Sequence, residues 1–111
     1  MTTLAQTMER LFGAVPPFWT HTELVAALKD WPLPQLMLPM YVEMAHVEHV
    51  QKFLQTQQLE VKDTSRSSDP VKIWCVSLRV EQLALLAALD DERVCYQAPT
   101  QQQTASPKQL A

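Results

Sequence analysis

Residues 40–57, MYVEMAHVEHVQKFLQTQ, are followed at residues 59–78 by LEVKDTSRSSDPVKIWCVSL, and these two neighbouring stretches decide the expected fold. In the first stretch apolar residues recur at helical spacing, which predicts a helix over 40–57 that is roughly 27 Å long. In the second, apolar and polar residues alternate on both sides of a polar turn, which is typical of a β-hairpin. A long helix beside a two-stranded hairpin is therefore the expected centre of the protein.

The N-terminal part predicts two shorter helices. The apolar residues within 3–13 form a stripe at helical spacing, which consists of Leu4, Met8, Leu11 and Phe12. Gly13 is a natural end for this first helix. Thr20 and Glu23 have the spacing of a capping box, in which each side chain accepts a hydrogen bond from the backbone N–H of the other residue. A second helix is therefore expected to begin at Thr20.

The segments on either side of the central stretch are expected to form a connector, a helix and a disordered tail. Residues 31–39 contain three prolines, which exclude a regular helix, so we expect an apolar connector there. Residues 79–91 show a broad apolar face at helical spacing and predict a last helix. Residues 97–111 are polar and of low complexity, which favours a disordered tail.

Length and composition limit the classes of protein that remain. The chain has 111 residues, enough for one compact domain, which we expect to span residues 1–96. Gly13 is the only glycine, so neither glycine-rich phosphate loop is possible. Cys75 and Cys95 lack the spacing of a zinc site or a disulfide scaffold. Because no apolar run is long enough to span a membrane and no secretory signal is visible, we expect a cytoplasmic protein without membrane contact.

The order of these elements resembles the winged helix-turn-helix superfamily, in the style of small MarR-like or phage and plasmid regulators. The stretch 18–28, FWTHTELVAAL, looks like its second helix, and the stretch 47–61, VEHVQKFLQTQQLEV, looks like the end of a recognition helix passing into a wing strand. The resemblance covers residues 3–78. It implies an α+β but mainly helical fold, with three helices, a hairpin wing and an additional C-terminal helix.

This resemblance implies a DNA-binding transcriptional regulator. The helix over 40–57 would enter the major groove, and the wing tip at 65–69 would contact the backbone or the minor groove. The side chains expected to contact duplex DNA are His46, His49, Lys52, Gln55, Lys62, Arg66 and Lys72. The net charge of −3, together with Glu43 and Glu48 on the same helix, counts against tight binding.

The alternative is an adaptor that binds another protein and no nucleic acid. Large apolar residues in the 31–40 connector and in the last helix would then be the contact points: Trp31, Leu36, Met37, Met40, Leu83 and Leu86. The same residues would otherwise close the core. The helix over 79–91 is expected either to pair two subunits as a homodimer or to cover the hairpin, whose faces are both apolar.

Metal binding and catalysis are weighed and not expected. Glu43, His46 and His49 recur at three-residue intervals, so neighbouring members could share a metal ion, but no further ligand can be placed beside them. Ser77 and Cys75 have neither a positioned base nor a glycine-bearing turn to activate them as nucleophiles. The sequence therefore predicts no enzyme, no metal and no cofactor.

Overall fold

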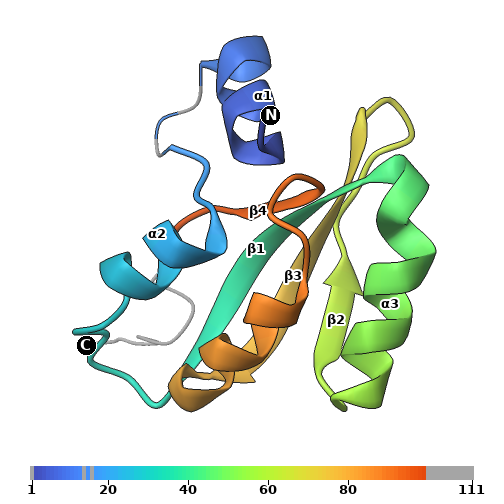
Figure 1. Ribbon diagram of the computed structural model, residues 1–111. Helices are drawn as coiled ribbons and strands as arrows, with labels where there is room; N and C mark the ends of the chain where they lie inside the picture. Colours follow the sequence, from blue (N-terminus) through green and yellow to red (C-terminus); the bar gives the residue numbers. More distant parts are fainter. Residues whose placement is uncertain (1, 14, 16, 100–111) are drawn as a thin grey trace, which may run out of the picture.

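A computed structural model describes residues 2–13, 15 and 17–99 (Figure 1). Within these residues the strands form one four-stranded antiparallel sheet in the order β2-β3-β1-β4. The elements in chain order are α1 (Leu4–Phe12), α2 (His21–Ala27), β1 (Gln35–Glu43), the 3-10 helix η1 (Met44–His46), α3 (Val47–Thr56), β2 (Glu60–Asp63), β3 (Val71–Arg79), the 3-10 helix η2 (Val80–Ala88) and β4 (Val94–Tyr96).

The winged helix-turn-helix fold expected from the sequence is wrong. The protein is an α+β domain organised around its sheet and is not mainly helical. The central pair is β1 and β3, which are in register from Gln35 opposite Arg79 to Glu43 opposite Val71. A winged helix has no long central strand before its recognition helix, and here β1 occupies that place.

Strand β1 corrects two expectations at once. Residues 31–40 are not an irregular connector, and residues 40–57 are not one helix, because the chain is extended from Gln35 to Glu43 and only then turns through η1 into α3. Alternate residues of β1 are buried, as in a strand with one face in a core. Those buried residues are Leu36, Leu38, Met40 and Val42.

Strand β1 tolerates Pro39 because the N–H that proline lacks would not take part in the hydrogen bonds between β1 and β3. Odd-numbered residues of β1 direct their backbone groups toward β4, as the bond from Glu43 N–H to Arg93 O indicates. Strand β4 ends at Tyr96, and Gln97 N–H donates to Pro39 O at 3.2 Å. The proline nitrogen therefore faces the end of the short edge strand, where a strand tolerates it.

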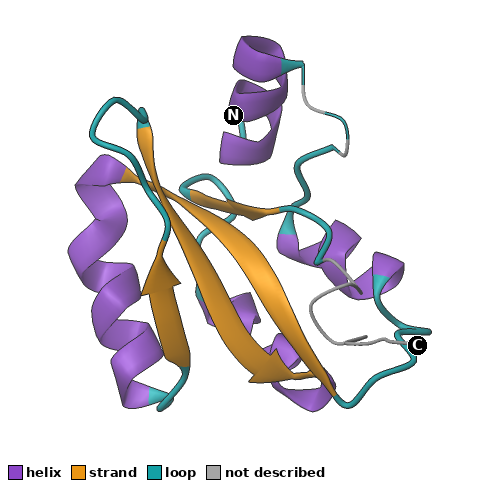
Figure 2. Ribbon diagram, turned by 180° about the vertical axis from the view of Figure 1, so that it is seen from behind, coloured by secondary structure: helices purple, strands orange, loops and turns teal. Residues whose placement is uncertain are grey.

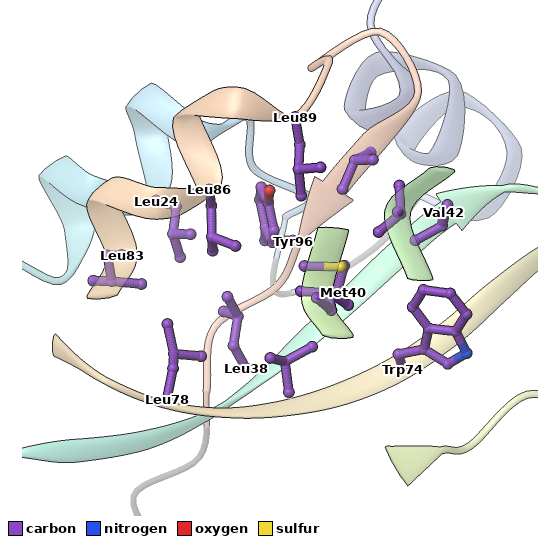
Figure 3. Packing of buried hydrophobic residues seen from close by; sticks show 14 of the residues in the cluster. Leu24, Leu38, Met40, Val42, Trp74, Leu78, Leu83, Leu86, Leu89 and Tyr96 are labelled. Carbon is purple, nitrogen blue, oxygen red and sulfur yellow. The ribbon is translucent and has the colours of Figure 1, made fainter. Parts of the chain in front are cut away.

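The two faces of the sheet are covered by different helices. The inner face carries Met40, Trp74 and Val76 and packs against α2, α3 and η2, as Figure 3 shows for the core cluster. The outer face carries Tyr41 and Ile73 and packs against a second cluster that includes α1. In Figure 2 the sheet lies in front of η2, and α1 stands above one end of it.

Helix α1 confirms its predicted range but buries only half of its stripe. Leu4 and Met8 pack on the outer face, whereas Leu11 and Phe12 are 62% and 55% exposed. Gly13 closes the helix with a left-handed φ of 55°, and its N–H donates to Glu9 O. The apolar stripe of α1 therefore extends beyond the part of the sheet that the helix covers, and its C-terminal residues stay exposed.

The second helix and the hairpin are confirmed as well. Thr20 and Glu23 form the predicted capping box at the start of α2. Strands β2 and β3 pair antiparallel within the stretch 59–78. The capping box predicted the start of the helix, and the alternation of apolar side chains predicted the hairpin, because both signals depend on contacts between residues close in the sequence.

The predicted helix over 79–91 is a 3-10 helix that ends at Ala88. Leu83, Leu86 and Leu89 are buried at intervals of three residues, which is the repeat of a 3-10 helix. These three side chains face the core, so η2 covers the inner face of the sheet. Of the two roles left open for this segment, covering the hairpin is the one observed.

Two expectations concern the ends of the chain and membranes. Most of the predicted disordered tail, residues 100–111, lies outside the described residues, and Pro99 is buried. Among the helices of the described part of the chain, none combines the length and the hydropathy needed to cross a bilayer.

Candidate functional site

A groove lies between the side chains of α3 and those of the β2–β3 pair. Figure 1 shows that α3 and β2 are neighbours at this side of the sheet. The volume of the groove is about 460 Å³. We call it the α3–β2 groove, and its lining residues are Val47, Gln51, Leu54, Gln55, Leu59, Val61, Asp63, Lys72 and Trp74.

The floor of the groove is apolar because apolar side chains from one side of α3 and from the inner face of β2 and β3 meet there. Val47 and Leu54 are seven residues, or two helical turns, apart, so they share a side of α3. Val61 of β2 lies opposite Val76 in the β2–β3 register, which places its side chain on the inner face. Trp74 is only 5% exposed, whereas Val61 is 40% exposed and borders the opening.

The rim of the groove is polar. Lys72 Nζ and Asp63 Oδ2 form an ion pair at 3.4 Å between partly exposed side chains. The backbone N–H of Ser65 donates to Asp63 Oδ1 at 2.8 Å, and this hydrogen bond holds the pKa of Asp63 below its usual range. Together with the amides of Gln51 and Gln55, the rim offers donors and acceptors above an apolar floor.

Strand β2 presents an unpaired backbone edge beside this groove. Thr64 N–H donates to Ile73 O at 2.9 Å, so residues in phase with Thr64, namely Glu60 and Lys62, direct their backbone groups toward β3. Val61 and Asp63 lie between them and direct their N–H and C=O groups away from the sheet. No described strand pairs with that side of β2.

At the opposite edge of the sheet, the segment before α2 pairs with β4 at Tyr96. Trp19 N–H donates to Tyr96 O at 2.7 Å, and Tyr96 N–H donates to Trp19 O at 2.9 Å. Phe18 anchors this segment, because its ring packs edge-on against Tyr41 at a centroid distance of 4.9 Å. Trp19 therefore covers the β4 edge at Tyr96, whereas no described strand pairs with the outer side of β2 beside the groove.

A histidine pair marks the N-terminal end of α3. The rings of His46 and His49 lie 4.7 Å apart, and the buried Nε2 of His46 has no hydrogen-bond partner among the described residues. Burial lowers the pKa of His46, and the nearby His49 and Arg93 lower it further. Arg93 in turn pairs with Glu43 at 2.9 Å.

The residues considered from the sequence as metal ligands or nucleophiles do not form a reactive site within the described part of the chain. Within the described residues no three side chains of His, Cys, Asp or Glu are grouped so that they could hold a metal ion. Burial raises the pKa of Cys75 and raises that of Cys95 to about 12, so neither thiol is activated as a thiolate.

The seven residues predicted to contact DNA lie on different surfaces. His49, Lys52 and Gln55 are exposed on α3, and His46 is half-buried at its start. Arg66 is exposed in the hairpin loop. Lys62 and Lys72 lie on opposite faces of the sheet, because Lys62 is opposite Cys75 and Lys72 is three residues away from it. The structure does not bring the seven onto one face.

Four of the six predicted partner contacts belong to the core, where no partner reaches them: Leu36, Met40, Leu83 and Leu86. Trp31 is half-buried, and its Nε1 donates to Gln35 O. Met37 is half-buried on the outer face. The prediction that these four residues contact a partner is wrong, because β1 and η2 direct their side chains into the core.

The sequence-based interpretation missed Val61 and Trp74 as site residues. The alternation of apolar and polar residues within 59–78 could have indicated them, because it shows which side chains share a face of the hairpin. It does not show that β2 is an edge strand or that α3 packs beside it, because strand order depends on residues far apart in the chain.

Comparison of the chain with protein-family models, with curated proteins and with solved structures finds no match.

Proposed function

We propose that the protein is an interaction module that receives a segment of another polypeptide as an additional strand on β2. The observation that carries the proposal is the outer side of β2, which no described strand pairs with and which lies beside the α3–β2 groove, whereas Trp19 pairs with β4 at Tyr96 on the opposite edge. This keeps the adaptor function considered from the sequence and moves its contact surface to β2.

The open edge supplies the main-chain part of such an interaction. An exposed edge strand is a template for another strand, and proteins that recognise extended peptides use it to gain affinity independent of sequence. Val61 and Asp63 direct N–H and C=O groups outward, so an added strand would find donors and acceptors at alternate residues.

The α3–β2 groove supplies the side-chain part. A residue directly opposite Val61 in an added strand would point its side chain to the inner face, where the groove opens. The volume of about 460 Å³ and the Trp74 floor suit a large apolar side chain. Gln51 and Gln55 could bind the polar groups beside it. The expected ligand is an extended segment with an apolar residue at this position.

Binding to duplex DNA stays a prediction. The basic residues expected to contact DNA are divided between the two faces of the sheet, and Lys72 is already paired with Asp63. No geometric observation favours DNA over a polypeptide ligand.

The test uses short synthetic peptides in which apolar and polar residues alternate, with binding followed by backbone amide chemical shifts. We expect shifts concentrated at residues 59–63 and on α3. Val61→Pro removes an outward N–H and leaves the bonds to β3 intact, so it should weaken peptide binding by about ten-fold or more. Peptides that bind elsewhere, or that bind Val61→Pro as well as the unaltered protein, would contradict the proposal.

Ser67→Pro is the matched control. Ser67 is exposed in the hairpin turn in which Asp69 N–H donates to Arg66 O, and the second position of such a turn favours proline. This variant introduces the same residue into the same hairpin without touching the open edge, so it should bind peptides like the unaltered protein.

A further inference from the structure

The open strand carries two charges of opposite sign around its central valine. Glu60 lies opposite Ser77 and Lys62 lies opposite Cys75, so both side chains point to the outer face, away from the groove. Both residues are exposed, and neither forms an ion pair with another residue in the described part of the chain. Val61, between them, points to the inner face.

This charge pattern discriminates between the ways in which two copies of β2 could pair. In an antiparallel pair related by a twofold axis, one residue lies opposite itself and its neighbours lie opposite each other. An axis at Glu60 sets two carboxylates opposite each other, and an axis at Lys62 sets two ammonium groups opposite each other. An axis at Val61 sets Glu60 of each copy opposite Lys62 of the other.

The register centred on Val61 also fits the backbone and the apolar surface. Val61 directs its N–H and C=O outward, so in this register the Val61 N–H of each copy donates to the Val61 C=O of the other. The two valine side chains then lie side by side across the axis. Each covers the other's exposed surface, which is 40% of the residue in the single copy.

We propose that the strand received by β2 is the β2 strand of a second copy, paired about Val61, so that the two sheets form one continuous antiparallel sheet. The inference rests on the proposed function, because it uses the same open edge, and it names the partner.

Charge-swapped variants test this register by sedimentation equilibrium at low salt. Glu60→Lys alone and Lys62→Glu alone each set like charges opposite each other twice in a dimer, so each should raise the dimer dissociation constant by about ten-fold or more. The double variant Glu60→Lys/Lys62→Glu should restore the dimer. An equal mixture of the two single variants should form a heterodimer, because its charges are again complementary.

Controls keep the result specific. Glu81→Lys changes the same charge at an exposed position of η2 and should leave the dimer unchanged. Circular dichroism verifies that each variant is folded. A protein that stays monomeric at all concentrations overturns the inference, and so does a dimer that Leu85→Glu on η2 dissociates while Lys62→Glu leaves it intact.

The outcomes also separate the inference from the proposed function. Peptide binding at β2 by a monomeric protein leaves the proposed function standing and removes the second copy as the partner. If Val61→Pro loses neither self-association nor peptide binding, the open edge is not the contact surface and both proposals fail.

Discussion

Tyr96 is buried to 0% exposure, and its hydroxyl has no hydrogen-bond partner among the described residues. Burial raises the pKa of Tyr96, so the phenol stays neutral. Figure 3 shows its ring among the leucines of α2 and η2. A buried polar group without a partner destabilises a fold, and tyrosine hydroxyls in cores usually have one.

We therefore expect Tyr96→Phe to raise the free energy of unfolding by about 1 kcal/mol, measured by urea denaturation. Tyr41→Phe is the matched comparison, because the Tyr41 hydroxyl donates to Gln97 Oε1 at 2.6 Å and its removal should lower the same free energy by about 1 kcal/mol. Equal effects of the two changes would contradict the prediction.

His46 makes the stability dependent on pH. Its pKa is lowered in the folded protein by burial and by His49 and Arg93, so the unfolded chain binds the proton more readily. The stabilisation is complete above the unfolded value of about 6.5 and is lost as the pH falls from there through the lowered folded pKa. His46 is also the N-cap of α3, where the helix dipole disfavours a positive charge.

Urea denaturation at several pH values between neutrality and about pH 5 measures this effect. The free energy of unfolding of the unaltered protein should fall with pH, and His46→Gln should reduce the slope. His49→Gln removes only one of the neighbouring charges and should reduce it less. A slope that is the same in all three proteins excludes His46 as its source.

The elements that the sequence predicted correctly are those whose residues contact near neighbours. Helices α1 and α2 are bounded by caps that involve residues three or four positions apart, and the hairpin is closed by a short polar loop. Strand β1 was missed because the three prolines within 31–39 led us to expect an irregular connector, and because residues 40–43 fitted the helical spacing of the stretch 40–57. In β1 every second side chain is buried and the others, apart from the exposed Gln35, are half-buried and mostly apolar, so hydropathy alone shows no period of two.

The capping box of α2 gives a prediction at this scale. Thr20 Oγ1 accepts from Glu23 N–H, and Glu23 Oε1 accepts from Thr20 N–H at 2.9 Å. Thr20→Ala should lower the free energy of unfolding by about 1 kcal/mol, because a short helix depends on its cap. Thr22→Ala, at an exposed position of the same helix, should change it by less than about 0.5 kcal/mol. Both values come from urea titrations.

At the scale of the whole molecule, the strand order determines which surfaces are available. Because β1 lies between β3 and β4, the hairpin is not a projecting wing, and β2 becomes the edge of the sheet. Within the hairpin, the β2–β3 register places Lys62 and Lys72 on opposite faces of the sheet. A DNA duplex docked against α3 could therefore contact only part of the predicted basic set.

This arrangement predicts weak or absent binding to random duplex DNA. Because the net charge is −3, binding to DNA at low salt should be weak. A plot of the logarithm of the binding constant against the logarithm of the salt concentration should have a shallow slope. Lys52→Ala together with Arg66→Ala should change little, because the two residues lie on separate elements. Tight binding that this double variant abolishes would support the regulator predicted from the sequence and contradict the present expectation.

The sequence by itself determined the local features: the caps of α1 and α2, the hairpin over 59–78 and the alternation of side chains along it. These depend on hydrogen bonds and contacts within a few residues, which composition and spacing describe. Only the tertiary structure decided that residues 35–43 form a central strand, that Trp19 pairs with β4 at Tyr96 and that the outer side of β2 is left unpaired beside α3. Those features depend on which distant segments pair, and pairing is selected by the burial of the whole core rather than by any one stretch.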